Sequence, residues 1–193
     1  MDNKKEAIIE SAIHAFREKG MEKATVSDIV KGAGIAQGTF YLYFSSKLSV
    51  MLSIAEEMTE RILREIQRNV HEELPFYRKL EIVVDIVFTM TKEYRDVFAL
   101  VYAGLASTDY MQEWETIYES YYAWFSNQLE QAKADGVIRA SLHPQRTAEI
   151  LIGLIEDAAE QTYMYSQQDD SKAELKKKEV LDFAGHALGL NPA

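Results

Sequence analysis

Helical periodicity is the sequence feature that most constrains the fold, because apolar residues recur every three or four positions through most of the 193 residues. Apolar side chains at i, i+3, i+4 and i+7 form one stripe on a helix. The opening stretch has this spacing at Ile9, Ala12, Ile13 and Phe16. With only 9 Gly and 3 Pro, the chain has few of the turn residues that a β-rich protein needs. No segment is a convincing strand, so we predict an all-α protein.

Glycine, proline and capping residues divide this pattern into about nine helices. Gly20 and Gly34 are placed to end the first two, Pro75 breaks the chain, and Pro144 suits the first turn of a later helix. The predicted helices cover residues 3–19, 25–33, 36–43, 47–70, 76–94, 96–107, 109–134, 144–166 and 171–188.

The second and third predicted helices are short and are joined by a turn that contains Gly34, which is the shape of a helix-turn-helix. The run from Thr25 to Asp28 has the form of a capping box at the start of the first of the two. Ser45 or Ser46 caps the long helix that follows. We therefore predict a helix-turn-helix DNA-binding domain in residues 1–46. Residues 47–193 are predicted to form a ligand-binding and dimerisation domain.

The segment from Gly34 to Phe44 fits the needs of a helix that enters the major groove. Such a helix needs an apolar back and a thin leading edge. The back is supplied by Ile35, Phe40 and Phe44, and the edge by Ala36, Gly38 and Thr39. A glycine inside a short helix costs about 1 kcal/mol against alanine. Gly38 is therefore expected where the backbone of another molecule comes close.

Polar groups in the same segment could reach bases and phosphates. The Gln37 amide can pair with N6 and N7 of adenine, and Thr39 offers a hydroxyl or a methyl group. Tyr41 and Tyr43 have phenols long enough to reach phosphate. Lys47 lies at a helix start, where both its ammonium and the helix N-terminus favour an anion. Packing of the aromatic rings in a core, with a solvated Gln37, is the alternative for each residue taken singly.

The run from Thr25 to Lys47 closely resembles the signature of the tetracycline-repressor (TetR) family. Its core is Gly-Thr-aromatic-Tyr-x-Tyr-Phe followed three residues later by Lys, and the resemblance covers roughly the first 50 residues. Three positions depart from the family pattern: Ala36 stands where Ser is frequent, Leu42 where His or Tyr is frequent, and Ser49 where Glu is common.

The resemblance implies a nine-helix, Ω-shaped homodimer that binds a palindromic operator and is released by a ligand. It places Gly38 close to the DNA backbone. It assigns DNA contacts to Thr25, Gln37, Thr39, Tyr41, Tyr43 and Lys47.

Charge is distributed unevenly along the chain. Residues 1–50 hold seven Lys or Arg and six Asp or Glu, so their net charge is +1. The remaining residues have a net charge of −11, and the two parts give the total of −10. Because the acidic body repels phosphate, DNA has to be met locally by the N-terminal domain. The chain has no Cys, no apolar leader and no apolar run of the ~20 residues that span a bilayer. We therefore expect a soluble, cytoplasmic protein.

The last two predicted helices are the candidates for a dimer interface. Between Ile150 and Ile155 the eighth helix is apolar on all sides, so one side can face the core and the other needs a second cover. A two-fold partner would supply that cover and would also present two heads to DNA. The alternative is an ordinary intramolecular core. The predicted interface residues are Leu151, Gly153, Ile155, Val180, Ala184 and Leu188.

Aromatic residues crowd the sixth and seventh helices, and two carboxylates lie at i, i+4 on the eighth. Such a set suits an apolar ligand cavity with a few polar groups, and buried carboxylates beside aromatic rings could hold a cation. A plain core and a solvated acidic face are the alternatives. The predicted ligand-binding residues are Phe98, Tyr102, Tyr118, Tyr122, Phe125, Glu156 and Glu160.

Together these features predict a ligand-responsive transcriptional regulator that represses by binding DNA as a dimer, with an unknown small-molecule effector. The four histidines are dispersed without metal spacing, and no nucleophile motif or phosphate-binding glycine loop is found. We therefore expect no metal, no cofactor and no catalytic residue. Two alternatives stay open: a helical ligand-binding or adaptor protein that does not bind an operator, and a helical enzyme that uses Glu156 and Glu160.

Overall fold

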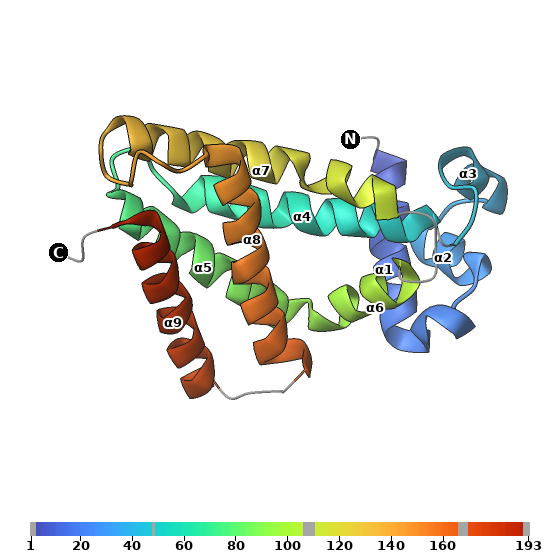
Figure 1. Ribbon diagram of the computed structural model, residues 1–193. Helices are drawn as coiled ribbons and strands as arrows, with labels where there is room; N and C mark the ends of the chain where they lie inside the picture. Colours follow the sequence, from blue (N-terminus) through green and yellow to red (C-terminus); the bar gives the residue numbers. More distant parts are fainter. Residues whose placement is uncertain (1–2, 48, 106–110, 166–169, 191–193) are drawn as a thin grey trace. The chain divides into compact units, whose positions relative to one another are not determined.

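The structure is a computed structural model that describes residues 3–47, 49–105, 111–165 and 170–190 (Figure 1). These residues form α-helices and one π-helical turn, without a strand, which confirms the predicted all-α class. The elements are α1 (Asn3–Lys23), α2 (Val26–Ala33), α3 (Gln37–Tyr43), α4 (Ser49–Asn69), α5 (Phe76–Glu93), α6 (Arg95–Leu105), α7 (Met111–Ala134), α8 (Pro144–Glu160), the π-helical turn η1 (Gln161–Tyr165) and α9 (Asp170–Leu188).

The chain divides into two compact units. The first comprises the described parts of Met1–Met58 and Asp96–Ile117, and the second comprises those of Thr59–Arg95 and Tyr118–Ala193. Helices α4 and α7 each run from one unit into the other. Helix α6 therefore belongs to the same unit as the N-terminal helices α1 to α3.

In the first unit, α2 packs on α1 and α3 packs on α2 (Figure 1). The apolar stripe predicted from the periodicity is buried along α1. Gly20 interrupts α1 with a left-handed φ of 75°, where the sequence predicts a helix end. The Ser11 hydroxyl donates to the carbonyl of Ile29 at 2.7 Å. A Cβ on Gly32 would clash with the same Ser11 oxygen, so a larger residue there would displace this hydroxyl and its bond to Ile29.

Local capping fixes the ends of the short helices. The Thr25 hydroxyl accepts from the amide of Asp28 at 3.2 Å, and the Asp28 carboxylate accepts from the amide of Thr25 at 3.0 Å, which confirms the capping box. Hydrogen bonds from Lys19 and then from Thr25 hold the pKa of Asp28 down to about 2, so this cap stays charged. Gly34 ends α2 with a φ of 67°.

A second reciprocal cap begins α4, where Ser46 is one of the two residues predicted to cap this helix and the returning bond from Ser49 was not predicted. The amide of Ser49 donates to the Ser46 hydroxyl at 3.1 Å, and the amide of Ser46 donates to the Ser49 hydroxyl at 3.2 Å. Ser49 therefore takes the place that Glu or Gln holds in a capping box, with a shorter side chain.

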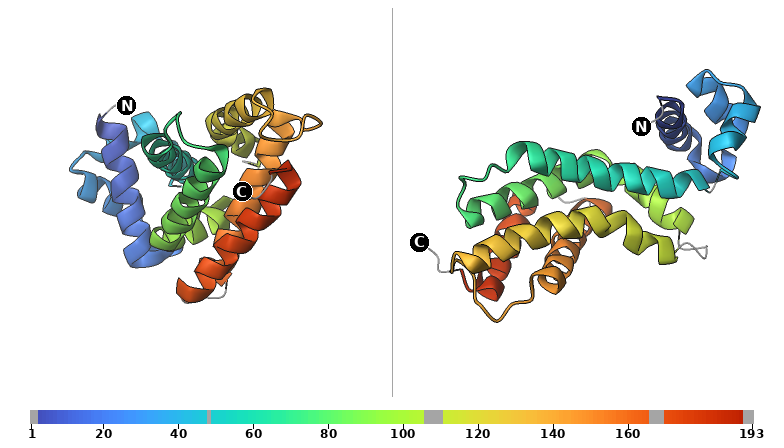
Figure 2. Two further views of the ribbon diagram at one scale, coloured as in Figure 1. Left: turned by 90° about the vertical axis from the view of Figure 1, so that its left-hand side faces the viewer. Right: turned by 90° about the horizontal axis from the view of Figure 1, so that it is seen from above.

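In the second unit, α5, α8 and α9 lie against one another (Figures 1 and 2). Helix α5 buries Leu80, Val83, Val84 and Val87 along one stripe. Ion pairs join α5 to α9, where Lys177 lies 2.8 Å from Asp85 and Lys92 lies 2.5 Å from Asp170. These ion pairs thus join α5 to α9 beside the buried apolar stripe of α5.

Five of the six predicted dimer residues lie inside this core rather than on a surface. Leu151, Ile155, Val180, Ala184 and Leu188 are buried within the single chain, whereas Gly153 is exposed.

The prediction therefore chose the inward face of α8 and α9, since the run from Ile150 to Ile155 is apolar all round and the stripe of α9 packs into the chain's own core. The outward face carries Ile150, 71% exposed, and Phe183, 64% exposed.

Candidate nucleic-acid interface

Helix α3 presents a polar edge on an anchored apolar back. Phe40 and Phe44 are buried with ring centroids 5.7 Å apart, and they fix the helix on its unit. On the other side, Gln37 and Gly38 are exposed, and Tyr41 is 52% exposed. This is the arrangement that a groove-entering helix needs: a rigid back and accessible groups at its N-terminal turn.

Gly38 has no packing partner that explains it. A Cβ placed on this residue would meet nothing within 4 Å among the described residues, so alanine would fit in the free protein. Glycine therefore lowers the helical propensity of α3 without relieving any contact within the chain. This is the expected behaviour at a surface where an external backbone approaches.

The other predicted DNA contacts have mixed environments. Thr39 and Tyr43 are half-buried. Thr25 is exposed, although its hydroxyl already caps α2. Leu42, at 82% exposed, lies on the outer side of α3, so an apolar surface stands at the position that departs from the family pattern.

Lys47 has a structural role that the sequence reasoning missed. Its ammonium donates to the carbonyl oxygens of Met21, of Ala24 at 2.9 Å and of Glu22 at 3.4 Å. These carbonyls lie 23 to 26 residues earlier, at the end of α1. An ammonium has three donors, and three carbonyls receive them here. Lys47 thus ties the end of α1 to the start of α4, a long-range contact with no local sequence signal.

The predicted ligand-binding residues do not fall in one unit. Phe98 and Tyr102, both half-buried, belong to α6 in the first unit. The remaining five lie in the second unit on α7 and α8. There, the Tyr118 and Tyr122 rings stack at 5.5 Å, and the Tyr118 hydroxyl donates to the carboxyl of Glu156. Phe125 is buried.

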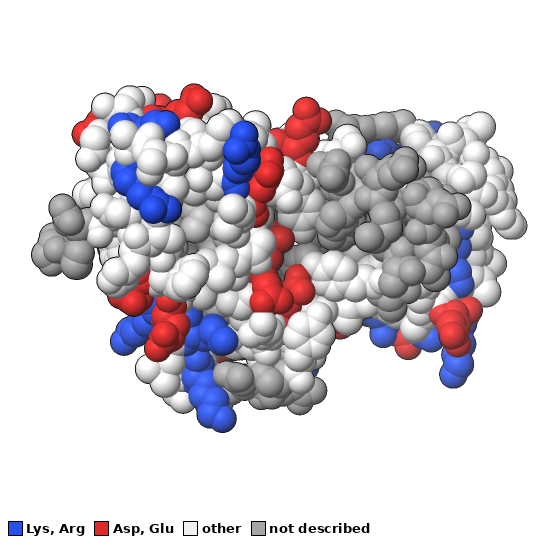
Figure 3. Space-filling model, in the orientation of Figure 1, with Lys and Arg blue, Asp and Glu red and all other residues white. Residues whose placement is uncertain are grey.

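Glu156 is the most perturbed acid of the second unit. Burial of its carboxyl raises the pKa to about 8, against the opposing effect of the Tyr118 hydrogen bond and with a further increase from the Glu160 charge. Acidic side chains form a column along α8 on the face shown in Figure 3, and Glu156 of this helix is half-buried. At neutral pH it is mostly protonated and can act as a hydrogen-bond donor.

Tyr121, which the prediction left out of the ligand-binding set, lies next to this acid. Its side chain is fully buried, and its hydroxyl has no hydrogen-bond partner in the described part of the chain. Burial raises its pKa, and the charge of Glu156 raises it further. A buried hydroxyl without a partner is costly, so this pair is a candidate polar anchor for a bound molecule.

Helix α6 is tied to α1 by a two-pronged ion pair. The Arg17 guanidinium donates to both carboxylate oxygens of Asp96, at 2.6 and 2.9 Å, and it holds the pKa of Asp96 below its usual range. The contact links α1, which carries the helix-turn-helix, to the start of α6 within the first unit.

Among the described residues, no three His, Asp or Glu side chains are grouped so that they could hold a metal ion. None of the described helices combines the length and apolar character required to cross a bilayer.

A helix-turn-helix with an outward second helix, fused to an all-helical body, defines a one-component DNA-binding regulator. Residues 8–54 match the model of the tetR family of bacterial regulatory proteins, and residues 80–188 match a tetracyclin repressor-like C-terminal domain. The chain is 40% identical over 186 residues to YvdT of Bacillus subtilis, an uncharacterized HTH-type transcriptional regulator, covering 96% of this chain and 95% of that one. The chain therefore belongs to the TetR family of transcriptional regulators.

Solved structures show the same fold. The FadR regulator of Bacillus subtilis, solved in complex with stearoyl-CoA, superposes with a TM-score of 0.76 at 23% identity, covering 93% of this chain and 96% of that one. The fatty acid degradation regulator FadR of Bacillus halodurans superposes with a TM-score of 0.74 at 24% identity, covering 92% and 94%.

Proposed function

We propose that this regulator is a repressor that binds a palindromic operator as a homodimer in the cytoplasm and is released by a small molecule. The observation that carries the proposal is α3, whose back is locked by Phe40 and Phe44 while Gln37, Gly38 and Tyr41 face outward. Two such helices one DNA turn apart, about 34 Å, would enter successive major grooves.

The residue roles follow from exposure and chemistry. Gln37 and Thr39 are proposed to contact base edges, and Tyr41 and Tyr43 to contact phosphates. Thr25, which is exposed at the start of α2, is also proposed to contact DNA. Lys47 is proposed to support the interface by holding the end of α1, since its donors are directed at carbonyl oxygens.

The homodimer is proposed to use the outward face of α8 and α9. Ile150 and Phe183 are large apolar side chains with most of their surface exposed in the single chain, and Gly153, exposed about one turn along α8 from Ile150, would permit close helix approach. A second copy of the chain is the partner proposed for this face, because a palindromic operator needs two α3 helices and each copy contributes one.

The effector is proposed to be an acyl thioester of coenzyme A, bound in the body with Glu156 and Tyr121 near its polar atoms. The B. subtilis FadR, which shares the fold, was solved with stearoyl-CoA. A protonated carboxyl and an unpartnered phenol both suit a neutral carbonyl group. A cationic effector is the second candidate, but it would have to ionise Glu156 on binding.

Operator binding can be tested by selecting bound sequences from random duplexes and measuring affinity by fluorescence anisotropy. We expect one palindromic sequence to be enriched. Gln37→Ala should lose discrimination at one base pair of each half-site, by about 1–3 kcal/mol. Gln145→Ala, an exposed glutamine on α8, is the matched control and should bind like wild type. A protein that enriches no sequence would instead be a ligand-binding or adaptor protein, and the proposal would fail.

Release can be tested on the same operator complex by adding stearoyl-CoA, coenzyme A alone or a hydrophobic quaternary ammonium. An allosteric coupling of about 1–3 kcal/mol would weaken operator binding about 5- to 150-fold. Release by stearoyl-CoA supports the thioester, release by the ammonium alone supports the cation, and release by neither contradicts both.

A further inference from the structure

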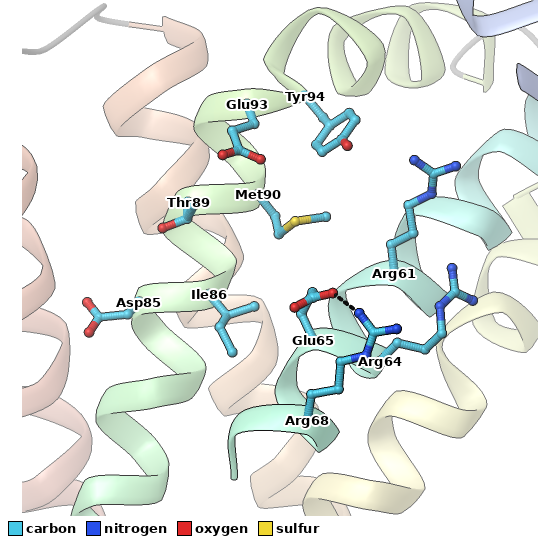
Figure 4. A pocket seen from close by; sticks show the side chains of 10 residues that line it. All are labelled: Arg61, Arg64, Glu65, Arg68, Asp85, Ile86, Thr89, Met90, Glu93 and Tyr94. Atoms are coloured by element: carbon cyan, nitrogen blue, oxygen red, sulfur yellow. Dashed lines mark hydrogen bonds and ion pairs between the residues drawn. The ribbon is translucent and has the colours of Figure 1, made fainter.

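The groove between α4 and α5 in the second unit is lined by charges of both signs (Figure 4). Three arginines of α4 lie there together with the carboxylates of Glu65, Asp85 and Glu93. Arg68 donates to Glu65 at 2.7 Å, and Asp85 accepts from Lys177 of α9 at 2.8 Å. Because opposite charges pair with one another here, the groove does not indicate the charge of a ligand. The exposed edge of α3, in the first unit, differs because it includes a large apolar side chain.

This apolar side chain on α3 is Leu42. Its exposed fraction is 82%, the highest among the large apolar side chains of the residues that the structure describes. A single exposed apolar side chain is ordinary on a protein surface, so its position in the fold decides whether it has a role. A partner that covered Leu42 would gain the free energy of removing this surface from water.

The exposed residues of α3 lie on one side of the helix, and they are Gln37, Gly38, Tyr41 and Leu42. Residues three or four positions apart are neighbours on a helix, so Gly38, Tyr41 and Leu42 adjoin one another. Phe40 is buried and anchors the other side of the helix. Leu42 therefore belongs to the edge that is proposed to enter the major groove.

The surface beside Leu42 is open. A Cβ on Gly38, one turn earlier, would meet nothing within 4 Å among the described residues, so the Leu42 side chain does not fill the space over Gly38. Gly38 and Leu42 together therefore form an open position with an apolar side chain next to it. A small apolar group of a bound molecule can lie there against Leu42.

The major groove of DNA offers one such group. Each base pair presents hydrogen-bond donors and acceptors there, and thymine adds its C5-methyl group. A leucine has no hydrogen bond to exchange with the polar edges or with phosphates, so the methyl group is the contact that suits it. Gln37 on the same edge can pair with N6 and N7 of adenine, and the thymine paired with an adenine presents its methyl group in the same groove.

We propose that Leu42 is a specificity-determining residue that contacts the C5-methyl group of one thymine in each half-site, in the open position beside Gly38. This rests on the proposed function, because it requires that α3 bind an operator. It adds to that function a base preference that depends on apolar contact and not on a hydrogen bond.

The test replaces single thymines of the selected operator by deoxyuridine, at the same position in both half-sites. Uracil pairs as thymine does and lacks only the C5-methyl group. Fluorescence anisotropy with the full-length protein should reveal one position where uracil weakens binding. Burial of one methyl group corresponds to about fourfold in affinity, so the two half-sites together should give about 15-fold.

Leu42→Ala should not distinguish uracil from thymine at this position. It should bind the thymine operator about as weakly as wild type binds the uracil operator, since the same contact is lost from the other partner. Circular dichroism checks that the fold is kept, as expected for a side chain that is 82% exposed.

Two further variants serve as controls. Gln37→Ala should weaken binding but keep the wild-type ratio between the thymine and uracil operators, because its amide contacts a different group. Val137→Ala, which shortens an exposed apolar side chain of the second unit, should bind both operators like wild type.

Two results would overturn the role of Leu42. One is an operator in which no thymine can be found whose replacement by uracil weakens binding. The other is a uracil effect of equal size in wild type and in Leu42→Ala, which would reflect the shape or deformability of the DNA. Either result, obtained with an enriched operator, would leave the proposed repressor standing. A protein that enriches no duplex would remove the repressor and the role of Leu42 together, so the two failures are distinguishable.

Discussion

Glu156 makes the stability of the protein depend on pH. Burial raises the pKa of this carboxyl from 4.5 to about 8 in the folded chain. Because the folded state holds the proton more tightly than the unfolded state, stability falls as the pH rises from about 4.5 to about 8 and then levels off. One pKa unit corresponds to ~1.4 kcal/mol, so the loss amounts to several kcal/mol.

Glu156→Gln should remove this dependence. We expect stability near wild type at pH 5 and several kcal/mol above wild type at pH 8.5, measured by urea unfolding at a fixed protein concentration. Glu149→Gln, an exposed glutamate on the same helix, is the control and should follow wild type at both pH values. A Glu156→Gln protein with the pH dependence of wild type would show that the carboxyl is not buried in solution.

A substitution of Lys47 can distinguish a structural role of this residue from direct contact with a DNA phosphate. Lys47→Met removes hydrogen bonds to three carbonyls at the end of α1 and should destabilise the N-terminal helices by about 1.5–3 kcal/mol. Operator affinity should fall for every sequence while its slope against log salt stays the same, since no phosphate contact is lost. A slope reduced by about 1, in duplex titrations at several salt concentrations, would instead assign the ammonium to phosphate.

At the scale of elements, replacing Gly38 should make α3 more stable and should weaken operator binding. Gly38→Ala introduces a Cβ with no contact within 4 Å in the described chain, so stability should rise by up to about 1 kcal/mol. Operator affinity should fall about tenfold or more if DNA approaches this edge. Gly185→Ala on α9 is the control, with space for a Cβ and no expected effect on DNA binding. Operator binding unchanged in Gly38→Ala would contradict the assignment of this edge.

The link between α1 and α6 can be measured by a double-mutant cycle. Arg17 and Asp96 are partly exposed, so the two-pronged pair should contribute about 0.2–1 kcal/mol and weaken with salt. Arg17→Gln, Asp96→Asn and their combination should therefore be non-additive by that amount in thermal unfolding at low salt. Additive effects would show that the pair does not persist in solution.

Elements differ in how far the sequence could predict them. The capping box of Thr25 and Asp28 and the helix ends at Gly20 and Gly34 could be predicted, because the interacting atoms lie within a few residues. The carbonyl partners of Lys47 could not, since they lie 23 to 26 residues away. The sequence within a few residues is enough to predict a helix and its ends. The contacts that a helix makes with distant parts of the chain depend on tertiary packing.

At the scale of the whole molecule, the sequence could not predict which side of each apolar helix faces the core. The run from Ile150 to Ile155 on α8 is apolar all round, so its periodicity predicted a packing partner on each side. The periodicity did not show which side packs against the core of the same chain. The outward edge of α3 was predictable because glycine and exposed polar groups are unusual there. The cluster of Tyr121 and Glu156 was predictable only in part, since the loss of a hydrogen-bond partner depends on the packing of α7 against other helices.

The proposed homodimer can be tested through operator affinity, because two DNA-binding domains held at a fixed spacing bind a palindrome more tightly than one. Phe183→Glu replaces an exposed aromatic side chain of α9 by a charge, which a partner copy would desolvate. We expect a monomer by light scattering after size exclusion, with the second unit still helical by circular dichroism. Affinity for the full palindrome should fall to that for a single half-site. Tyr77→Glu, which changes an exposed aromatic residue on α5, should remain dimeric and bind normally. If Phe183→Glu stayed dimeric and kept full operator affinity, the two-fold axis would have to lie elsewhere, and the outward face of α9 would need a different explanation.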